Sequence, residues 1–374
     1  MDWTPFRAHF PTTARWAFFD HASVAAPPTP CAEAIAEWAR DKAINGTTSY
    51  LPWVARVEKV RALAGRLLNA DPRDVCFVGS TTQGVGMIAE GFPWVAGDNV
   101  VTAAEEYPSN QYPWMNLRDR GVAVRAVPSR GNRIDIADIR AAMDGRTRVL
   151  AMSSVEFASG FRNDLDALGD LCRRRGIFFF VDAIQSLGAF PMDVQRTPID
   201  ALAADGHKWM LGPEGAGIAY VRREWVERLH PIGVGWNSVV NAAEFSAIDF
   251  RLKPHAGRWE GGTMNVGGIV GLGESLRLLL DAGIENVQAR VLELTDDLGE
   301  KVTSAGAEVF SSRSAGEGSG IVSLLTPGRD PKGLMHQCRA AGVVVNVRGG
   351  RLRVSPHAYN TPEEIDRLVE VLAS

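Results

Sequence analysis

Ala204-Asp205-Gly206-His207-Lys208-Trp209-Met210-Leu211-Gly212-Pro213 is the part of this sequence from which the architecture can be worked out. Its lysine comes 26 residues after Asp182, the acid that ends the apolar run Phe178-Phe179-Phe180-Val181. Simple packing explains neither the acid nor the later His-Lys pair. The two segments together indicate a bound group that needs an acid, an amine and a cation.

Short apolar segments alternate with helical patterns around this region. Strands are predicted at residues 75–78, 99–102, 122–127, 149–153, 177–181, 199–203 and 217–221. One of the intervening helices has Asp164 as its predicted N-cap and ends at Gly176. Continuous apolar strands separated by helices predict an α/β fold with a mostly parallel, seven-stranded sheet buried on both faces. In such a sheet the ligand lies beyond the carboxyl ends of the strands, where Asp182 falls.

The chain of 374 residues is long enough for two domains. Composition becomes loop-rich near residues 230–260, and strand and helix patterns resume beyond it, with a last helix that starts after Thr361. We predict an N-terminal segment over the active site (1–24), a large domain (25–254) and a smaller C-terminal α+β domain (255–374).

Charge and composition exclude several classes of function. The net charge is −4, and no basic block suggests nucleic-acid binding. The four cysteines lack the spacing of a metal site or a disulfide framework, which favours a reducing, cytoplasmic location. No signal peptide is read, and the apolar runs are too short to span a bilayer. We therefore expect no metal, no nucleic acid and no membrane partner.

The residues around Lys208 suit pyridoxal phosphate (PLP). A Schiff-base lysine needs a lowered pKa, and His207 with the apolar Trp209 offers a suitable setting. Asp182 can keep a pyridine nitrogen protonated, so that the ring accepts electrons from a carbanion. Gln185 can donate a hydrogen bond to the ring hydroxyl, although it would serve equally as a polar surface residue.

Three further segments offer ligands for such a cofactor and its substrate. Gly79-Ser80-Thr81-Thr82-Gln83-Gly84-Val85 follows a strand and opens a helix, an arrangement that can bind phosphate but is also a common N-cap. Tyr107 can stack on a ring or be a half-buried loop residue. Arg353 alternates with apolar neighbours on a strand, where it can bind a substrate carboxylate or belong to a solvated edge.

Taken together, these residues resemble the class V aminotransferase family of fold-type I PLP enzymes. Gly206-His207-Lys208 with Gly212-Pro213 is similar to the family's Ser-Gly-His-Lys…Gly-Pro signature, and Val181-Asp182-Ala183-Ile184-Gln185 to its Val-Asp-Gly-Ala-Gln motif. Phe18-Phe19-Asp20-His21-Ala22-Ser23 resembles the opening segment that passes over the active site. The resemblance implies an aspartate-aminotransferase-like fold, an amino-acid substrate and PLP as cofactor.

The same resemblance implies roles for individual residues. Thr81 and Thr82 would bind the phosphate, Tyr107 would stack on the ring, and Arg353 would hold the substrate carboxylate. Arg258-Trp259-Glu260-Gly261-Gly262-Thr263 resembles the segment whose threonine reaches the phosphate of the neighbouring subunit. This implies that Thr263 completes a partner's site in a homodimer with shared active sites.

Three departures from the family pattern bear on function. Asp205 stands where a phosphate-binding serine is usual, and Glu156 lies near a position often filled by asparagine or glutamine. The stretch 343–353 is short and has no cysteine, whereas a cysteine desulfurase needs a thiolate there to accept sulfur.

We therefore expect a lyase or an epimerase-like enzyme that acts on an amino acid through Lys208. A class V aminotransferase and a cysteine desulfurase or selenocysteine lyase are the alternatives, and a non-catalytic PLP-fold protein is a remote one. A nucleotide-dependent oxidoreductase is rejected, because the glycine fingerprint of a dinucleotide site is missing.

Overall fold

A large sheet of seven strands forms the centre of the computed structural model, which describes residues 1–374. Its spatial order is β2-β8-β7-β6-β5-β3-β4, and only β8 runs antiparallel to its neighbours. The strands are β2 (Val75–Val78), β3 (Asn99–Ala103), β4 (Ala123–Val127), β5 (Thr147–Ser153), β6 (Phe178–Asp182), β7 (Ala201–Asp205) and β8 (Gly217–Val221). The predicted mostly parallel sheet is confirmed, with every predicted strand present.

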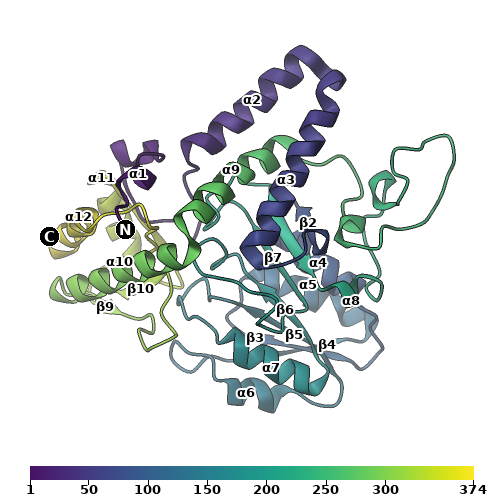
Figure 1. The fold of residues 1–374 in the computed structure, drawn as a ribbon. Coiled ribbons are helices and arrows are strands. Elements are labelled where there is room, and N and C mark those ends of the chain that lie inside the picture. Colours follow the sequence, from purple (N-terminus) through teal and green to yellow (C-terminus); the bar gives the residue numbers. More distant parts are fainter.

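Both faces of this sheet are buried except at the edge strand β4, because alternate residues of the other six strands enter different core clusters. Phe179 and Val181 of β6 belong to one cluster, and Phe178 and Phe180 to the other. The helices of this unit are α2 (Thr29–Asn45), α3 (Tyr50–Leu68), α4 (Thr81–Gly91), α5 (Tyr112–Met115), α6 (Ile136–Ala142), α7 (Leu165–Arg175), α8 (Arg223–Val226) and α9 (Val266–Ala282). Figure 1 shows α9 lying beside α2 and α3, against which it packs.

A second, smaller unit lies at one end of the molecule, in yellow-green in Figure 1. Its four-stranded sheet has the order β12-β13-β10-β9. The elements are α10 (Ile284–Ser304), β9 (Glu308–Val309), β10 (Val322–Leu325), α11 (Pro331–Ala340), β11 (Val343–Val344), β12 (Asn346–Arg348), β13 (Arg351–Val354) and α12 (Pro362–Ala373). Thr361 caps α12 in a capping box with Glu364, as the sequence predicts.

Packing divides the chain later than the predicted boundary between residues 254 and 255. Trp259 packs on one face of the large sheet, and Leu272 and Leu276 of α9 belong to the core on its other face. The small unit's own core begins with Leu294 of α10. The apolar face of α9 is therefore covered by the large unit, and the chain crosses to the small unit within α10, whose Ile284, Val287 and Val291 still pack in the core of the large unit.

The N-terminal segment joins the two units. It begins with α1 (Thr4–Arg7), and β1 (Ala17–Phe18) pairs in parallel with β11 of the small unit. The Ala25 N–H then donates to the carbonyl of His207, next to Lys208. No helix in the structure combines the length and apolar character needed to cross a membrane.

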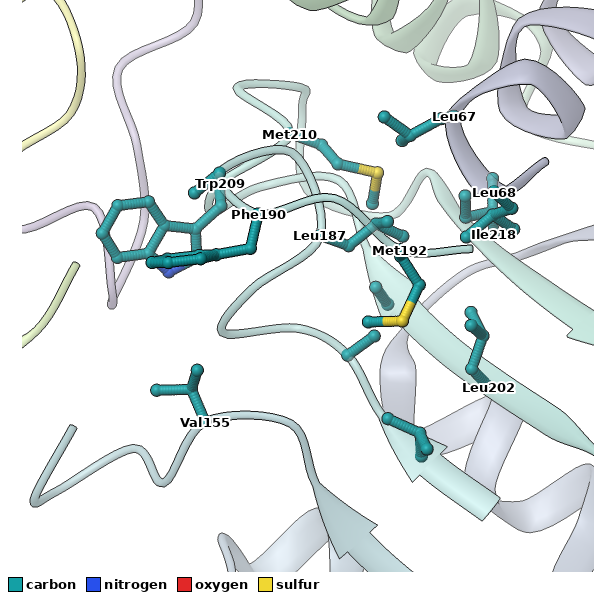
Figure 2. Packing of buried hydrophobic residues seen from close by; sticks show 14 of the residues in the cluster. Leu67, Leu68, Val155, Leu187, Phe190, Met192, Leu202, Trp209, Met210 and Ile218 are labelled. Atoms are coloured by element: carbon teal, nitrogen blue, oxygen red, sulfur yellow. The ribbon is translucent and has the colours of Figure 1, made fainter. Parts of the chain in front are cut away.

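The turn that carries Lys208 is anchored by the core. Trp209 and Met210 belong to the cluster that Figure 2 shows with Leu187, Phe190 and Met192. A lysine followed directly by two fully buried residues has little freedom to move its backbone.

Candidate active site

Asp182 is the last residue of β6, so it lies at the edge of the sheet where the parallel strands end. It is buried, and its Oδ1 accepts a hydrogen bond from the Ile184 N–H at 3.0 Å. Burial raises the pKa of this carboxyl to about 6, against the opposing effects of that hydrogen bond and the nearby Lys208 charge. A partner that carries a positive charge would favour the ionised carboxylate.

Lys208 lies in the turn that follows β7 and is only 9% exposed. Its Nζ makes no hydrogen bond to the protein, and it lies 5.6 Å from the centre of the Tyr107 ring. Burial is the main reason that its pKa falls to about 8; Asp182 opposes the change, and the charges of Arg353 and Arg348 add to it. Roughly a fifth of this amine is therefore neutral at pH of about 7.4, far more than for an ordinary lysine, and the neutral form can act as a nucleophile.

Backbone strain marks the same turn. Leu211 has φ of 57°, a left-handed conformation that a leucine rarely adopts and that costs about 1–3 kcal/mol. The Leu211 N–H donates to the Lys208 carbonyl, and the Leu211 carbonyl accepts from Ser275 Oγ of α9. Contacts from the large unit thus hold the turn in a shape that the chain alone would not prefer.

The start of α4 supplies hydroxyl and N–H donors beside this turn. Ser80 caps the helix, and Thr82 Oγ1 donates to Ser109 Oγ at 2.8 Å on an exposed edge. Thr81 is instead turned inward, where its Oγ1 accepts the Asp205 N–H at 2.9 Å. Thr82 and Ser109 are therefore the hydroxyls available to an anion at this helix N-terminus.

The carboxylate of Asp205, which stands where a serine is usual, contacts the next two residues of its own turn. Its Oδ1 accepts the Gly206 N–H at 2.7 Å. Its Oδ2 lies 2.9 Å from Nδ1 of His207, close enough for an ion pair but out of line for a hydrogen bond. One oxygen therefore faces backbone, and the other faces a ring that can carry a compensating positive charge.

Gln185 lies between the N-terminal segment and the turn of Lys208. Its amide nitrogen donates to the Ala22 carbonyl, and its amide oxygen accepts from the Trp209 indole, both at 3.1 Å. One N–H of the amide remains for a ligand. The side chain thus joins three segments in addition to any contact with a ring hydroxyl.

Arg353 comes from β13 of the small unit and is 1% exposed, so the solvated-edge alternative is wrong. Its Nη1 donates to the Phe157 carbonyl at 2.9 Å, and its Nη2 donates to Ser23 Oγ at 2.6 Å. Asp20 lies 3.5 Å away, and Nε is buried without a partner. Burial lowers the pKa of this guanidinium to about 10, an effect that a bound carboxylate would offset.

Thr263 is exposed and lines a cavity of about 240 Å³ together with Gly79 and Gln83 of its own chain. The segment before it is fixed by Glu260, whose Oε1 lies 2.6 Å from Nη1 of the buried Arg61. Thr263 therefore sits near the start of α4, but not among the residues around Lys208.

Several polar residues of the site escaped sequence reasoning. Ser109 and Ser23 carry no pattern of their own, although both lie within segments that were singled out. The buried acid Glu106, which follows β3 near Asp182, was missed as well; Glu156, which follows β5, was already noted in the sequence, and neither acid forms an ion pair. Both acids lie three residues beyond the end of an apolar strand, near the strand-end position that identified Asp182.

The arrangement fits a pyridine aldehyde that carries a phosphate. Lys208 and Asp182 are a buried amine and a buried acid that lack a polar side-chain partner, and an aromatic ring lies beside the amine. Lys208, Asp182 and Gln185 would hold the aldehyde, the ring nitrogen and the ring hydroxyl. Thr82, Ser109 and His207 would surround the phosphate, with Tyr107 against the ring.

Comparison with known proteins agrees with this geometry. The family model described as "Aminotransferase class-V" matches residues 17–368. A probable cysteine desulfurase of Methanothermobacter thermautotrophicus is 29% identical over 98% of this chain and 96% of its own length. A cysteine desulfurase of Cronobacter sakazakii is 30% identical over 75% of this chain and 72% of its own length.

Solved structures show the same fold. The apo cysteine desulfurase of Thermococcus onnurineus NA1 superposes with a TM-score of 0.90 at 23% identity, over 98% of this chain and 96% of that chain. A cystine C–S lyase in complex with its product, cysteine persulfide, gives a TM-score of 0.92 at 22% identity, over 98% and 99% of the two chains.

Proposed function

Because this chain belongs to the class V aminotransferase family and is a PLP-dependent enzyme, we propose that it is a lyase that cleaves the bond between Cβ and sulfur in an amino acid. The sulfur would leave as sulfide from cysteine, as a thiol from a thioether or as cysteine persulfide from cystine, and the rest of the substrate, with one water, would become pyruvate and ammonium. The names of the similar cysteine desulfurases and of the cystine C–S lyase support this substrate class.

The hairpin between β12 and β13 carries the proposal. Gly349 and Gly350 alone join Arg348 to Arg351, and both glycines have positive φ, 55° and 72°, as a tight two-residue turn requires. The chain therefore has no loop here that could carry a sulfur-accepting cysteine. We propose that the sulfur product is released into solution.

The four cysteines support the same conclusion, because all are buried and unpaired. Burial raises the pKa of Cys31 and of Cys338 to about 11 and raises the pKa of Cys76 and Cys172 even further. A thiol accepts sulfur as the thiolate, which these sites disfavour. Unpaired cysteines also suit a reducing, cytoplasmic location, which we propose for this enzyme.

The residues around Lys208 have separate tasks in this reaction. When bound, PLP supplies an electron-accepting ring for the electron pair freed at the substrate's α-carbon. Lys208 Nζ accepts the proton from that carbon, since its lowered pKa of about 8 leaves a larger part of the amine neutral than in an ordinary lysine. Asp182 provides a negative charge at the buried end of the site, and Arg353 orients the substrate by its α-carboxylate.

We also propose that the enzyme is a homodimer with shared active sites. A green loop projects from the large unit after α8 in Figure 1. It exposes Phe245 by 73%, Ile248 by 96% and Phe250 by 70%. Large apolar side chains gathered on one loop mark a protein interface more often than a free surface. Light scattering should give twice the mass of one chain, and a Phe245→Ser/Ile248→Ser variant should shift it toward the monomer.

Incubation of the PLP-loaded protein with L-cysteine and L-cystine tests the proposed reaction. We expect sulfide from L-cysteine and cysteine persulfide from L-cystine, each in an amount equal to the pyruvate, and no product from Lys208→Ala. Recovery of D-cysteine with no pyruvate would replace the lyase with an epimerase. Transfer of the amino group to a keto acid without loss of sulfur would replace it with an aminotransferase.

A further inference from the structure

Two arginines of the β12–β13 hairpin converge on one hydroxyl in the wall of the site. Nη2 of Arg353 donates to Ser23 Oγ at 2.6 Å, and Nη2 of Arg348 lies 3.5 Å from the same oxygen. Both guanidiniums are near enough to Lys208 for their charges to lower its pKa. Arg348 therefore belongs to the same cluster of side chains as Arg353 and the reactive amine.

Few negative charges face this pair. Asp20, from the N-terminal segment, is the one carboxylate within ion-pair distance; it lies 3.5 Å from Arg353, and Arg348 forms no ion pair. Asp182 lies on the far side of Lys208, from the large sheet, and acts on the pKa of that lysine. Asp205 also acts on the pKa of Lys208, but neither Asp182 nor Asp205 lies within ion-pair distance of Arg348 or Arg353.

Arg351 lies on the same face of the hairpin but is already engaged. Its guanidinium sits 3.9 Å from the centre of the Phe310 ring, and its Nε donates to Ser323 Oγ. Arg348, in contrast, uses Nη1 for Asn346 Oδ1 and its neighbour's carbonyl and leaves Nε unused. A guanidinium with free donors beside a second one is completed by an anion.

Resting on the proposed function, we infer that Arg348 binds a second anionic group of the substrate while Arg353 holds the α-carboxylate. The substrates are then sulfur amino acids with an acidic group at the far end of the side chain. The two-glycine turn directly after Arg348 keeps the distance between the two guanidiniums short and fixed. Arg348 becomes the residue that selects the substrate by charge.

A role as a brace for the hairpin is the competing explanation, because Nη1 bonds to Asn346 and Val347. If Arg348 only stabilises the hairpin, the affinity for a ligand does not depend on the charge of that ligand. Ligands of equal shape and different charge therefore separate the two explanations.

The experiment uses the PLP-loaded protein with S-carboxymethyl-L-cysteine and its neutral analogue, S-carbamoylmethyl-L-cysteine. Calorimetry measures binding, and thiol release is followed in parallel. We expect the acid to bind about tenfold tighter than the amide, the ratio that a single charge-assisted contact of about 1.4 kcal/mol gives. Arg348→Gln should bring the ratio to about one, and Arg348→Lys should restore part of it.

Arg351→Gln is the matched control, since it removes an equal charge from the same hairpin face and should leave the preference in place. Equal binding of acid and amide by the unmodified protein, or a preference that survives Arg348→Gln, would overturn the inference. Release of thiol from both ligands in that case would leave the proposed lyase intact. A clear preference without thiol release would retain the role of Arg348 and overturn the lyase, and binding of neither ligand would overturn both.

Discussion

The amine of Lys208 lies 5.6 Å from the centre of the Tyr107 ring, although 101 residues separate the two in the chain. The turn after β7 supplies the lysine, and the loop after β3 supplies the ring. Strands β5 and β6 lie between them, so the contact requires both segments to cross the end of the sheet. This space above the strand ends, with Asp182 at its base, is where the chemistry of the proposed enzyme takes place.

Uptake of PLP should report the lowered pKa of Lys208. The amine attacks an aldehyde in its neutral form, so the uptake rate should rise with pH and level off above about 8 instead of near 10.5. Stopped-flow absorbance of the cofactor-free protein mixed with PLP, across a pH series, measures this rate. A rate still rising steeply above pH of about 9.5 would contradict the lowered pKa. Lys208→Ala should show no covalent uptake at any pH.

Glu156 should make stability depend on pH in a defined direction. Burial and then the charge of Glu106 raise its pKa well above 4.5, and its Oε2 has no hydrogen-bond partner. The folded state therefore holds a proton that the unfolded state releases, and this contribution to stability is lost as pH rises above about 4.5 toward the folded pKa. Glu156→Gln has no such loss, so its Tm relative to the unmodified protein should climb between pH of about 5 and 8.5.

The control for Glu156→Gln is Glu308→Gln, a substitution on the exposed strand β9. The Tm of this control relative to the unmodified protein should not change over the same pH range. A flat response of Glu156→Gln as well would mean that Glu156 ionises as it would in water. Differential scanning fluorimetry in a single mixed buffer gives all of these values.

Alkylation should leave the activity untouched. Burial raises the pKa of all four thiols, so iodoacetamide at neutral pH should label none of Cys31, Cys76, Cys172 and Cys338 in the folded protein. Peptide mass spectrometry checks the labelling, and thiol release checks the activity. The same treatment in urea should label all four. Inhibition that follows modification of one cysteine would show that an enzyme thiol takes part.

Replacing two glycines of α4 by alanine should change the stability of the protein in opposite directions. A Cβ at Gly84 would lie 2.3 Å from the Ala203 Cβ of β7, so Gly84→Ala should cost about 1–3 kcal/mol and weaken PLP binding by displacing the start of α4. A Cβ at Gly86 would meet nothing within 4 Å, so Gly86→Ala should stabilise the helix by about 0.5–1 kcal/mol.

Thermal melting with and without PLP measures both glycine effects. If both variants gained stability, the packing of α4 on β7 would be looser than the structure has it. If both lost stability, the space around Gly86 would be smaller than it is here.

Much of the fold was readable from local pattern. Seven apolar segments predicted seven strands, and Asp164 and Thr361 predicted two helix starts, because period and capping depend on neighbours in the chain. The boundary between the two domains could not be predicted as well from local patterns. Helix α9 follows a loop-rich region in sequence, yet its apolar face packs on α2 and α3, and no local pattern states which unit a helix covers.

For the site, residue order was sufficient to select Lys208 and Asp182, because an acid at a strand end and an amine in a following turn are local features. Their shifted pKa values were not readable, since burial and nearby charge depend on segments distant in the chain. Folding alone brought Arg348 and Arg353 to Ser23, 325 and 330 residues away, and turned Thr81 toward Asp205. The local sequence identified the reactive residues. The packing of distant segments determined their pKa values and the residues that they contact.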